Sequence, residues 1–534
     1  MCRKWPHAAR LWPAPRDGIH LPMSALSPPP AAPLGSPIAE ARWRPVRAMQ
    51  RLIGGYGEGA VVAITLGLFA VLWLVFHTVA LAPVDLRDDA SEAALWAQHF
   101  AFGYKHPPMT AWLFMAWFAV LPRADWAMHL AAVTLAALAL FVAWRLSRDH
   151  LDRDRALLGL GALILVPLYT FKAAELNANT AMMPFWAAAL LFYLRARRGL
   201  GRWDSLLAGA FASCALLGKY WAVYLFAGMA LASVVGAGTR RFWRSPSPYL
   251  MAAGAIVVIA PHLYWYAAQD GGSNYAFVRD SVMTADSFGT ALARSVYYLL
   301  GVVAFAAGPL VLLALLRPSR AALADIVWPA DDERRQAVIL FVVPMLLPAL
   351  VNLFAPYRLT PDWTFPNWPL LPIVLYGSRK IAVDSFAAAG ALLIALAVSL
   401  GFVAAAPLIG YAHLKAGLDS NRPSSQEVAQ YARQLGARPA LLYWGSADLV
   451  GNLPFYLPGA KPLDGDPLSP AGRGEIAAQG LLIVCLDSDA PCRTTAGALG
   501  DTQARAADVA VRRTFLGFSG PPYGFHIAVL PARQ

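Results

Sequence analysis

The sequence predicts a polytopic α-helical membrane protein that ends in a small α/β domain. Of its 534 residues, 58% are hydrophobic and only 14% are charged, whereas soluble domains carry about 25% charged residues. Long apolar stretches alternate with short basic loops as far as about residue 410, and polar residues with short β-like runs follow. The first two observations indicate repeated membrane crossings, and the third indicates a separate domain outside the bilayer.

The basic residues orient this chain. Residues 1–55 are rich in Pro, Ala and Arg and have no long apolar run, so we expect a basic, disordered tail rather than a signal peptide. The net charge of +12 is typical of a membrane protein whose cytoplasmic loops retain Lys and Arg, and we do not take it as a sign of nucleic-acid binding. Arg42, Arg44, Arg47 and Arg51 precede the first apolar span, which predicts a cytoplasmic N-terminus and an outer position for Asp85.

The positions of the later basic clusters limit how many membrane spans can lie between them. If all of them are cytoplasmic, an even number of spans lies between successive clusters. Counting 107–121 as a span would break this rule, and about 15 residues are too few to cross. We therefore expect 107–121 to be a juxtamembrane or re-entrant helix at the outer surface. About eleven spans are then expected, at 60–81, 126–145, 156–171, 180–195, 205–218, 221–237, 250–267, 294–316, 336–354, 367–378 and 385–410.

The division into domains follows from the same pattern, with a tail at 1–55, a membrane domain at 56–410 and a soluble domain at 411–534. In the last of these, short β-like runs begin at Leu441, Leu481 and Phe525, with helix-like stretches between them. Parity places the domain outside. There Cys485 and Cys492 could form a disulfide, and two buried free thiols are an equally good interpretation.

Polar residues collect on the outer side in this topology. Loops are polar in most proteins, which is enough to explain any one of these residues, but ionisable groups near membrane depth are costly and the whole set predicts a site at the lipid–water boundary. The candidate residues are Asp88, Asp89, Glu92, Lys105, His106, Glu175, Asn177, Lys219, Tyr220, His262, Arg358, Asp362 and Trp363.

A pair of carboxylates is the candidate for acid–base chemistry. Asp89, Glu92 and Trp96 are spaced i, i+3 and i+7, so they share one face of a helix. Mutual repulsion and partial desolvation would raise a carboxyl pKa and suit the group to act as a base. Asp88 lies on another side, where it would cap the helix or be solvated. Acidic residues at a helix start are also common without catalysis.

Cations from separate loops indicate an anionic ligand. Lys105, Lys219 and Arg358 are far apart in the sequence, and a phosphate is one reason to gather them. Snorkelling to the headgroups explains Lys105 equally well. Trp363 and its aromatic neighbours could stack on a sugar, although an interfacial aromatic belt requires no ligand.

Five short motifs together resemble a known family. They are DxxExxxW at 89–96, GYKHPP at 103–108, NANT at 177–180, LGKYW at 217–221 and YRLTPDWTFPNWPLLP from Tyr357. With the layout of the chain, they resemble the GT-C glycosyltransferases, and within them glycosyltransferase family 39, the branch related to protein O-mannosyltransferases and lipid A aminoarabinose transferases. Many relatives have adjacent Asp and Glu in the first loop. Here Asp88-Asp89 is followed by Glu92 a turn later, which leaves the identity of the base open.

The resemblance implies a GT-C fold and a reaction. It implies transfer of a sugar, with inversion, from a polyprenyl-phosphate donor to a lipid, glycan or protein acceptor on the periplasmic side of a bacterial inner membrane. Asp89 would be the base, and Glu92 would orient the acceptor or replace Asp89. Lys105, Lys219 and Arg358 would stabilise the leaving phosphate. The positions implied to place the substrate are Asp88, His106, Glu175, Asn177, Tyr220, His262, Asp362 and Trp363. No cofactor is implied, and a divalent metal ion held by Asp89 and Glu175 stays open.

Two other functions remain to be compared with this one. A transporter or flippase should have charges near the bilayer midplane and repeated halves, but the charges gather at one face and we find no repeat. A non-catalytic scaffold that binds a cell-wall polymer would not need the full acidic and basic set. The sequence therefore favours the transferase.

Overall fold

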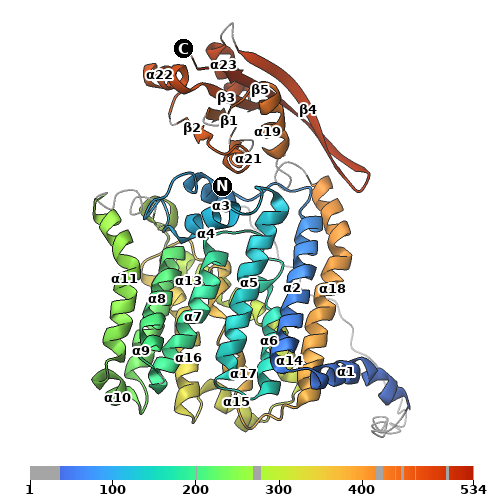
Figure 1. The fold of residues 1–534 in the computed structure, drawn as a ribbon, viewed down its shortest axis with the longest axis vertical. Helices are drawn as coiled ribbons and strands as arrows, with labels where there is room; N and C mark the ends of the chain where they lie inside the picture. The colour runs from blue at the N-terminus through green and yellow to red at the C-terminus, as the bar shows by residue number, and fades with distance from the viewer. Residues whose placement is uncertain are drawn as a thin grey trace, which may run out of the picture. The chain divides into compact units, whose positions relative to one another are not determined.

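The computed structural model describes residues 37–199, 201–268, 278–416, 425–438, 441–446, 450–463, 465–500 and 504–532. The chain separates into a short unit, Met1–Pro45, and a large unit, Val46–Gln534. Helix α1 (Pro37–Gly55) begins in the first and ends in the second. The large unit contains a helical bundle and a five-stranded sheet at one end of that bundle (Figure 1).

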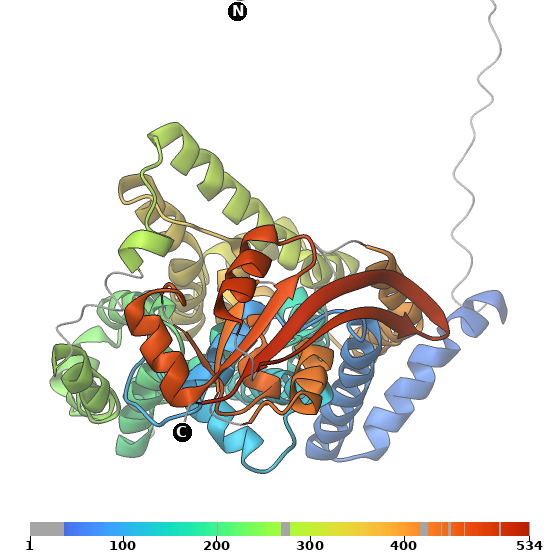
Figure 2. The ribbon, with the colours of Figure 1, turned by 90° about the horizontal axis from the view of Figure 1, so that it is seen from above.

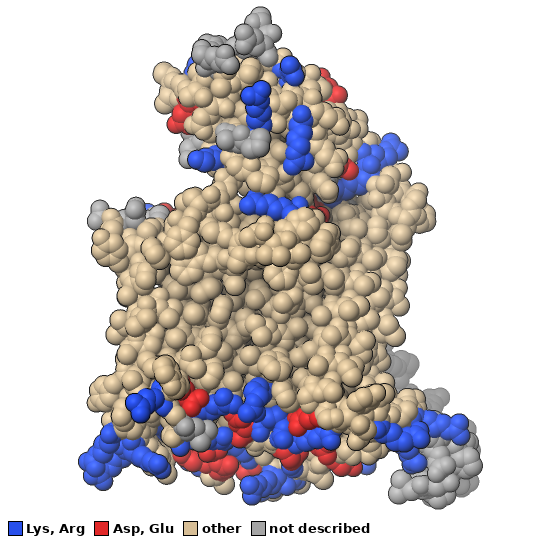
Figure 3. Space-filling view, viewed as in Figure 1, with Lys and Arg blue, Asp and Glu red and all other residues tan. Residues whose placement is uncertain are grey.

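The bundle is built to cross a membrane. Among the described residues, six helices are long and apolar enough to do so. They are α2 (Glu58–Ala80), α5 (Asp125–Arg148), α11 (Ser247–Ala268), α13 (Phe288–Phe305), α16 (Asp332–Phe354) and α18 (Ser385–Lys415). Charged side chains gather at the end of the bundle opposite the sheet, and a broad belt nearly free of them separates that end from the sheet on the face shown in Figure 3.

Other helices complete the bundle and its connections. They are α6 (Arg153–Ile164), α7 (Ala178–Arg198), α8 (Arg202–Gly218), α9 (Val223–Val234), α10 (Thr239–Arg244), α14 (Ala307–Leu315) and α15 (Arg320–Val327). Glycines allow α8 and α11 to pack closely. A Cβ at Gly209 would lie 1.8 Å from the Met251 carbonyl oxygen, and one at Gly254 would lie 2.1 Å from that of Leu206, as in membrane helix pairs that meet at small residues.

Several of the expected spans are not single helices: residues 156–171, for example, run past the end of α6 at Ile164 into a 3-10 turn, η1 (Pro167–Tyr169). Residues 294–316 form parts of α13 and α14, which are separate helices on either side of Ala306. Residues 367–378 include the end of a 3-10 helix, η4 (Pro361–Asn367), and the six-residue α17 (Leu371–Tyr376). Proline removes a backbone donor, and Pro361, Pro366, Pro369 and Pro372 interrupt this segment. The total of eleven crossings therefore stays a prediction.

The segment 107–121 forms the short helix that parity predicted. Helix α4 (Met109–Phe118) has ten residues, which is about 15 Å and too short to cross a bilayer. It lies with α3 (Asp88–Trp96) at the sheet end of the bundle (Figure 1). Met109, Ala111 and Phe114 of α4 are buried, so the helix packs onto the bundle rather than standing free in solvent.

The C-terminal part is a mixed sheet with helices, as predicted. The strands occur in the order β2-β1-β3-β5-β4. They are β1 (Leu442–Gly445), β2 (Lys461–Pro462), β3 (Leu481–Leu486), β4 (Arg505–Phe515) and β5 (Phe518–Leu530), and the helices are α19 (Ser425–Gln434), α21 (Leu453–Tyr456), α22 (Pro470–Gln479) and α23 (Ala490–Leu499). The three predicted runs correspond to β1, β3 and the end of β5. Sequence patterns missed β2 and β4, because β2 has two residues and β4 exposes much of its length.

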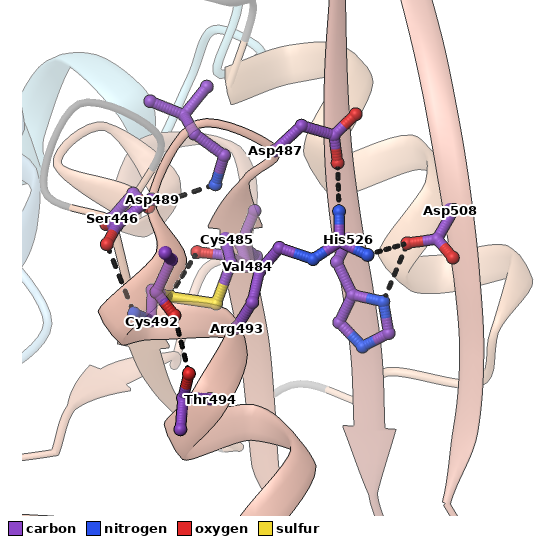
Figure 4. Close-up of a disulfide and its surroundings, with 12 residues drawn as sticks. Ser446, Val484, Cys485, Asp487, Asp489, Cys492, Arg493, Thr494, Asp508 and His526 are labelled. Atoms are coloured by element: carbon purple, nitrogen blue, oxygen red, sulfur yellow. Dashed lines mark hydrogen bonds and ion pairs between the residues drawn. A yellow bond between two sulfur atoms is a disulfide. The ribbon is translucent and has the colours of Figure 1, made fainter.

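A disulfide joins β3 to the helix that follows it. Cys485 and Cys492 are bonded (Figure 4), which decides between the two interpretations of these cysteines. Around them, Ser446 Oγ donates to Asp489 at 2.7 Å, and Arg493 pairs with Asp487 at 2.5 Å. A bond of this kind persists in an oxidising compartment.

Candidate active site

A cavity of about 500 Å³ opens at the sheet end of the bundle, under α3. It is lined by one face of α3, the GYKHPP loop, the junction of α8 with the 3-10 turn η2 (Tyr220–Ala222), and the end of α16. Seven of the thirteen candidate residues line this first cavity. They are Asp89, Glu92, Lys105, His106, Lys219, Tyr220 and Trp363.

Helix α3 turns one face to the first cavity and the other to the C-terminal domain. Asp89, Glu92 and Trp96 line the cavity together, as their spacing predicted. Ala90, Ala93 and Ala94 on the opposite face are buried in a core shared with α21. The sheet domain therefore forms part of the support of this helix.

Hydrogen bonds from the C-terminal domain hold the segments before and after α3. Asn452 Nδ2 donates to the Leu86 carbonyl at 2.5 Å, and Gln98 Nε2 donates to the Ala460 carbonyl at 2.8 Å. Just before α3, the buried Asp85 carboxylate accepts from Ser425 Oγ at 2.6 Å. These contacts between distant parts of the chain fix where Asp89 and Glu92 lie.

The two carboxylates of α3 have different surroundings. Glu92 pairs with Lys105 at 2.5 Å, and its other oxygen is 3.9 Å from His106 Nε2. Within the described ranges, Asp89 has neither a hydrogen bond nor an ion pair through its carboxylate. Glu92 is thus neutralised by a cation rather than opposed by Asp89, and Asp89 is the carboxylate available to a ligand.

Lys219 supplies a second cation to the same cavity. It lies in extended backbone between α8 and η2, where Nζ donates to Asn179 Oδ1 at 3.0 Å and lies 4.6 Å from the centre of the Trp363 ring. Burial lowers the pKa of Lys219 to about 8, against the opposing charges of Asp89 and Asp362. The lysine is therefore mostly protonated at neutral pH.

His106 contributes a neutral group beside these cations. Burial, followed by the charges of Lys219 and Lys105, lowers the pKa of His106 to about 4. At neutral pH the wall thus presents two ammonium groups and an uncharged imidazole. Cations with this geometry suit an anion such as a phosphate.

Aromatic rings form the opposite wall. Trp221 meets Trp363 edge to face at 5.2 Å, and Tyr357 stacks on Trp363 at 6.1 Å between ring centres. The Tyr224 and Tyr357 hydroxyls are 3.1 Å apart. Such a surface can accept an apolar chain or the face of a sugar.

A second cavity, of about 780 Å³, meets the first at Asp89. Its walls come from α2, α5, α18 and the segments around Arg87 and Glu175. Among the described residues, Asp89 alone lines both cavities. Glu175 is only 5% exposed, and its carboxylate accepts from the Arg87 backbone N–H at 3.2 Å. Burial raises the pKa of Glu175 to about 7.

Three other candidates support the site without lining the first cavity. Asn177 caps α7, since its Oδ1 accepts from the Asn179 and Thr180 backbones. Asp362 pairs with Lys172 at 2.7 Å. His262 contacts the Phe102 carbonyl at 2.7 Å and the Tyr220 hydroxyl at 2.8 Å, which connects the GYKHPP loop to η2.

Of the remaining two candidates, one is not where the sequence placed it. The Arg358 side chain is exposed and lines neither cavity. Its neighbour Tyr357 is 7% exposed and lines the first cavity instead, because Tyr357 pairs with Met283 in a β-bridge and successive side chains in extended backbone point to opposite sides. Arg87 rather than Asp88 occupies the N-cap of α3, and the Asp88 side chain lies outside the described residues.

Sequence reasoning missed several lining residues. Tyr357, Tyr224 and Asn179 all line the first cavity, and none was among the thirteen candidates, although Asn179 lies in the NANT motif and Tyr357 begins the last of the five motifs. Tyr224 follows Tyr220 by four residues and Asn179 follows Asn177 by two, so proximity to a candidate was the available signal. The described part of the chain contains no group of three His, Cys, Asp or Glu side chains that could hold a metal ion, and no metal role is assigned to Asp89 or Glu175.

Comparison with known proteins points to one activity. The model of the dolichyl-phosphate-mannose-protein mannosyltransferase family matches residues 105–265. The lipopolysaccharide core galacturonosyltransferase RgtB of Rhizobium johnstonii is 27% identical over 418 residues, which are 72% of this chain and 78% of the relative. These likenesses support a glycosyltransferase rather than a transporter.

Solved structures show the same fold. The crystal structure of ArnT from Cupriavidus metallidurans bound to undecaprenyl phosphate aligns with a TM-score of 0.59 and 15% identity, over 88% of this chain and 98% of that one. The structure of ArnT without ligand aligns with a TM-score of 0.58 and 14% identity over the same shares. The chain therefore has the GT-C fold that the motifs predicted.

Proposed function

We propose that this chain, a membrane glycosyltransferase of the GT-C superfamily, transfers a sugar from a polyprenyl phosphate to a membrane-linked acceptor at the periplasmic face of the bacterial inner membrane. The observation that carries the proposal is the position of Asp89. Its carboxylate, which has no hydrogen-bond or ion-pair partner among the described residues, lies in the cavity that holds Lys105 and Lys219, and Asp89 also lines the second cavity. Two substrates that enter separate cavities would meet there.

The donor is assigned to the first cavity. Lys105 and Lys219 would hold the phosphate, and the aromatic and aliphatic wall would hold the first isoprene units. The ArnT structure with undecaprenyl phosphate supports this class of ligand. As the sugar–phosphate bond breaks, the two ammonium groups would stabilise the charge that develops on the leaving phosphate, which is commonly a large part of catalysis.

The acceptor is assigned to the second cavity. Its walls include Phe76 and Ala80 of α2 and Phe402 and Ile409 of α18, and these apolar helices suit a saccharide on a lipid anchor. The similarity to RgtB, a lipopolysaccharide core galacturonosyltransferase, supports an acceptor of this kind. Asp89 would take the proton of the attacking hydroxyl. Attack from the side opposite the departing phosphate would invert the anomeric carbon.

The orientation follows from charge. The α10 loop and the start of α16 lie at the end of the bundle away from the sheet domain (Figure 1) and carry Arg240, Arg241, Arg334 and Arg335. Cytoplasmic loops retain such residues. The proposal therefore places the N-terminus in the cytoplasm and both cavities with the sheet domain in the periplasm, where the Cys485–Cys492 bond would persist.

The test is to replace each α3 carboxylate in turn. Asp89→Asn should lower transfer by roughly 10²- to 10⁴-fold, the usual contribution of a general base. Glu92→Gln should have a smaller effect, because it leaves the base in place and removes only the ion pair between Glu92 and Lys105. The measurement is mass spectrometry of envelope glycolipids from a deletion strain that carries each variant at matched protein levels.

The matched control is Asp154→Asn, which removes a carboxylate at the start of α6 that lines neither cavity. It should restore the glycolipid pattern fully. Full restoration by Asp89→Asn would show that Asp89 is not the base, and an unchanged pattern in the deletion strain itself would refute the proposed function.

A further inference from the structure

The β4–β5 hairpin projects past the rest of the sheet. Only Phe525–Leu530 of β5 pairs with β3, so in the outer half of the hairpin, from Ala510 to Gly524, β4 and β5 pair only with each other. Figures 1 and 2 both show this part extending over the bundle toward the sheet end of α18. A two-stranded ribbon of this kind is only marginally stable by itself in water.

The turn of the hairpin has an unusual residue. Leu516 and Gly517 connect the strands, and both have positive φ, +49° and +84°. Two-residue turns of this conformation strongly favour Asn-Gly or Asp-Gly, and leucine is rarely found there because its Cβ is crowded. The Leu516 side chain is also 66% exposed, and Phe518 next to the turn is 54% exposed. The positive φ at position 516 disfavours leucine, and contact with water disfavours both Leu516 and Phe518.

The tip adjoins the end of a membrane helix. The Phe518 ring meets Tyr411 of α18 at 4.9 Å, and Lys415 Nζ donates to the Ser519 carbonyl at 3.0 Å. Phe515 covers Gly410, where an added Cβ would lie 2.6 Å from the ring. These contacts fix the tip against the last turns of α18.

The depth of this contact corresponds to the membrane boundary. Helix α18 has 31 residues, about 46 Å of helix, which exceeds the roughly 30 Å hydrocarbon core and matches the full thickness with headgroups. Leu408, one turn before Tyr411, is 71% exposed and so faces lipid. Tyr and Lys are typical of the interface itself, which places Tyr411, Lys415 and the hairpin tip at headgroup depth.

We infer that the hairpin tip is a membrane anchor, with Leu516 and Phe518 inserted at the boundary between headgroups and acyl chains of the leaflet beneath the sheet domain. An apolar setting explains why leucine and phenylalanine stand where a soluble hairpin would have polar residues. The exposed Arg512 and Lys415 flank the tip and would face lipid phosphates. The anchor holds the sheet domain at a second point besides its contacts with α3, and this inference does not depend on the transfer reaction.

The experiment measures lipid contact at the tip in the full-length protein. Leu516→Cys, made after Cys2→Ser and Cys214→Ser, is labelled with an NBD fluorophore and reconstituted into vesicles that carry nitroxide-labelled lipids. The matched control is Gly474→Cys in α22, an exposed position with open space around it in the same domain. The expected result is blue-shifted emission at 516 that is mostly lost to lipid nitroxides near the headgroup, and no such loss at 474.

A second variant separates insertion from simple folding. Leu516→Asn creates the Asn-Gly turn that this conformation prefers, so the hairpin stays folded but loses its apolar tip. With the label at Phe518→Cys, this change should reduce nitroxide quenching and increase quenching by aqueous iodide. Equal lipid quenching at 516 and 474 would overturn the inference. So would a label at 516 that is shielded from iodide but untouched by lipid nitroxides, because another copy of the chain or a polymer would then cover the tip.

Discussion

Lys219 shows how one buried cation can set the pH range in which a phosphate is bound. Burial lowers the pKa of its ammonium group to about 8, and Asp89 and Asp362 keep it from falling further. As the pH rises through 8 in the free protein, Lys219 loses its proton and the first cavity loses one of its two cations. Arginine at this position would remain charged throughout, because its pKa exceeds about 12.

We therefore predict that the affinity for undecaprenyl phosphate falls above pH 8. In Lys219→Arg this fall should disappear, and in Lys219→Met the affinity should be weak and nearly independent of pH in that range. Calorimetric titration of the purified protein with undecaprenyl phosphate between pH 6.5 and 9.5 measures this affinity. The experiment does not require the identity of the sugar. A wild-type affinity that is flat to pH 9.5 would contradict the assignment of Lys219 to the phosphate.

Single residues could be predicted from the sequence where the relevant geometry is local. The shared face of Asp89, Glu92 and Trp96 follows from helical spacing alone. Arg358 was misplaced because its direction depends on a β-bridge between Met283 and Tyr357, which are 74 positions apart. No local pattern reveals such a bridge. Likewise, the engagement of Glu92 by Lys105 requires the loop after α3 to fold back.

At the level of elements, α3 is held by two domains. Its alanine face packs against α21, and Asn452 donates to Leu86 just ahead of it. The partners are 366 positions apart, so no sequence pattern predicts them. The helix itself, the six long apolar helices and the strands β1 and β3 were predictable, because their patterns depend on neighbouring residues in the sequence.

Asn452→Ala should therefore slow transfer although Asn452 lines neither cavity. The change leaves the buried Leu86 carbonyl without its donor, at a cost of about 1–3 kcal/mol, and it loosens the start of α3. We expect a lower initial rate of glycolipid modification in membranes, with protein of normal abundance. Thr494→Ala, which removes an exposed hydrogen bond on α23 at 2.9 Å, is the control in the same domain. Equal rates in the two variants would mean that the C-terminal domain does not position α3.

At the scale of the whole molecule, the distribution of charge supports the proposed orientation. The end of the bundle away from the sheet is densely charged, and the belt above it is nearly free of charge on the face in Figure 3. The N-terminus, the α10 loop and the start of α16 share the basic character that keeps loops in the cytoplasm. Parity from the sequence and this charged end agree in placing the sheet domain on the other side.

The orientation can be tested with single cysteines in a protein that carries Cys2→Ser and Cys214→Ser. Ala237→Cys lies in the exposed loop before α10, and Gly474→Cys lies on the sheet domain. A maleimide that cannot cross the inner membrane should label position 474 in spheroplasts and reach position 237 only after the membrane is permeabilised, because the basic loop remains inside. Labelling of position 237 before permeabilisation, with position 474 protected, would show that the protein has the opposite orientation in the membrane. Both cavities would then face the cytoplasm, and a periplasmic acceptor could not reach Asp89.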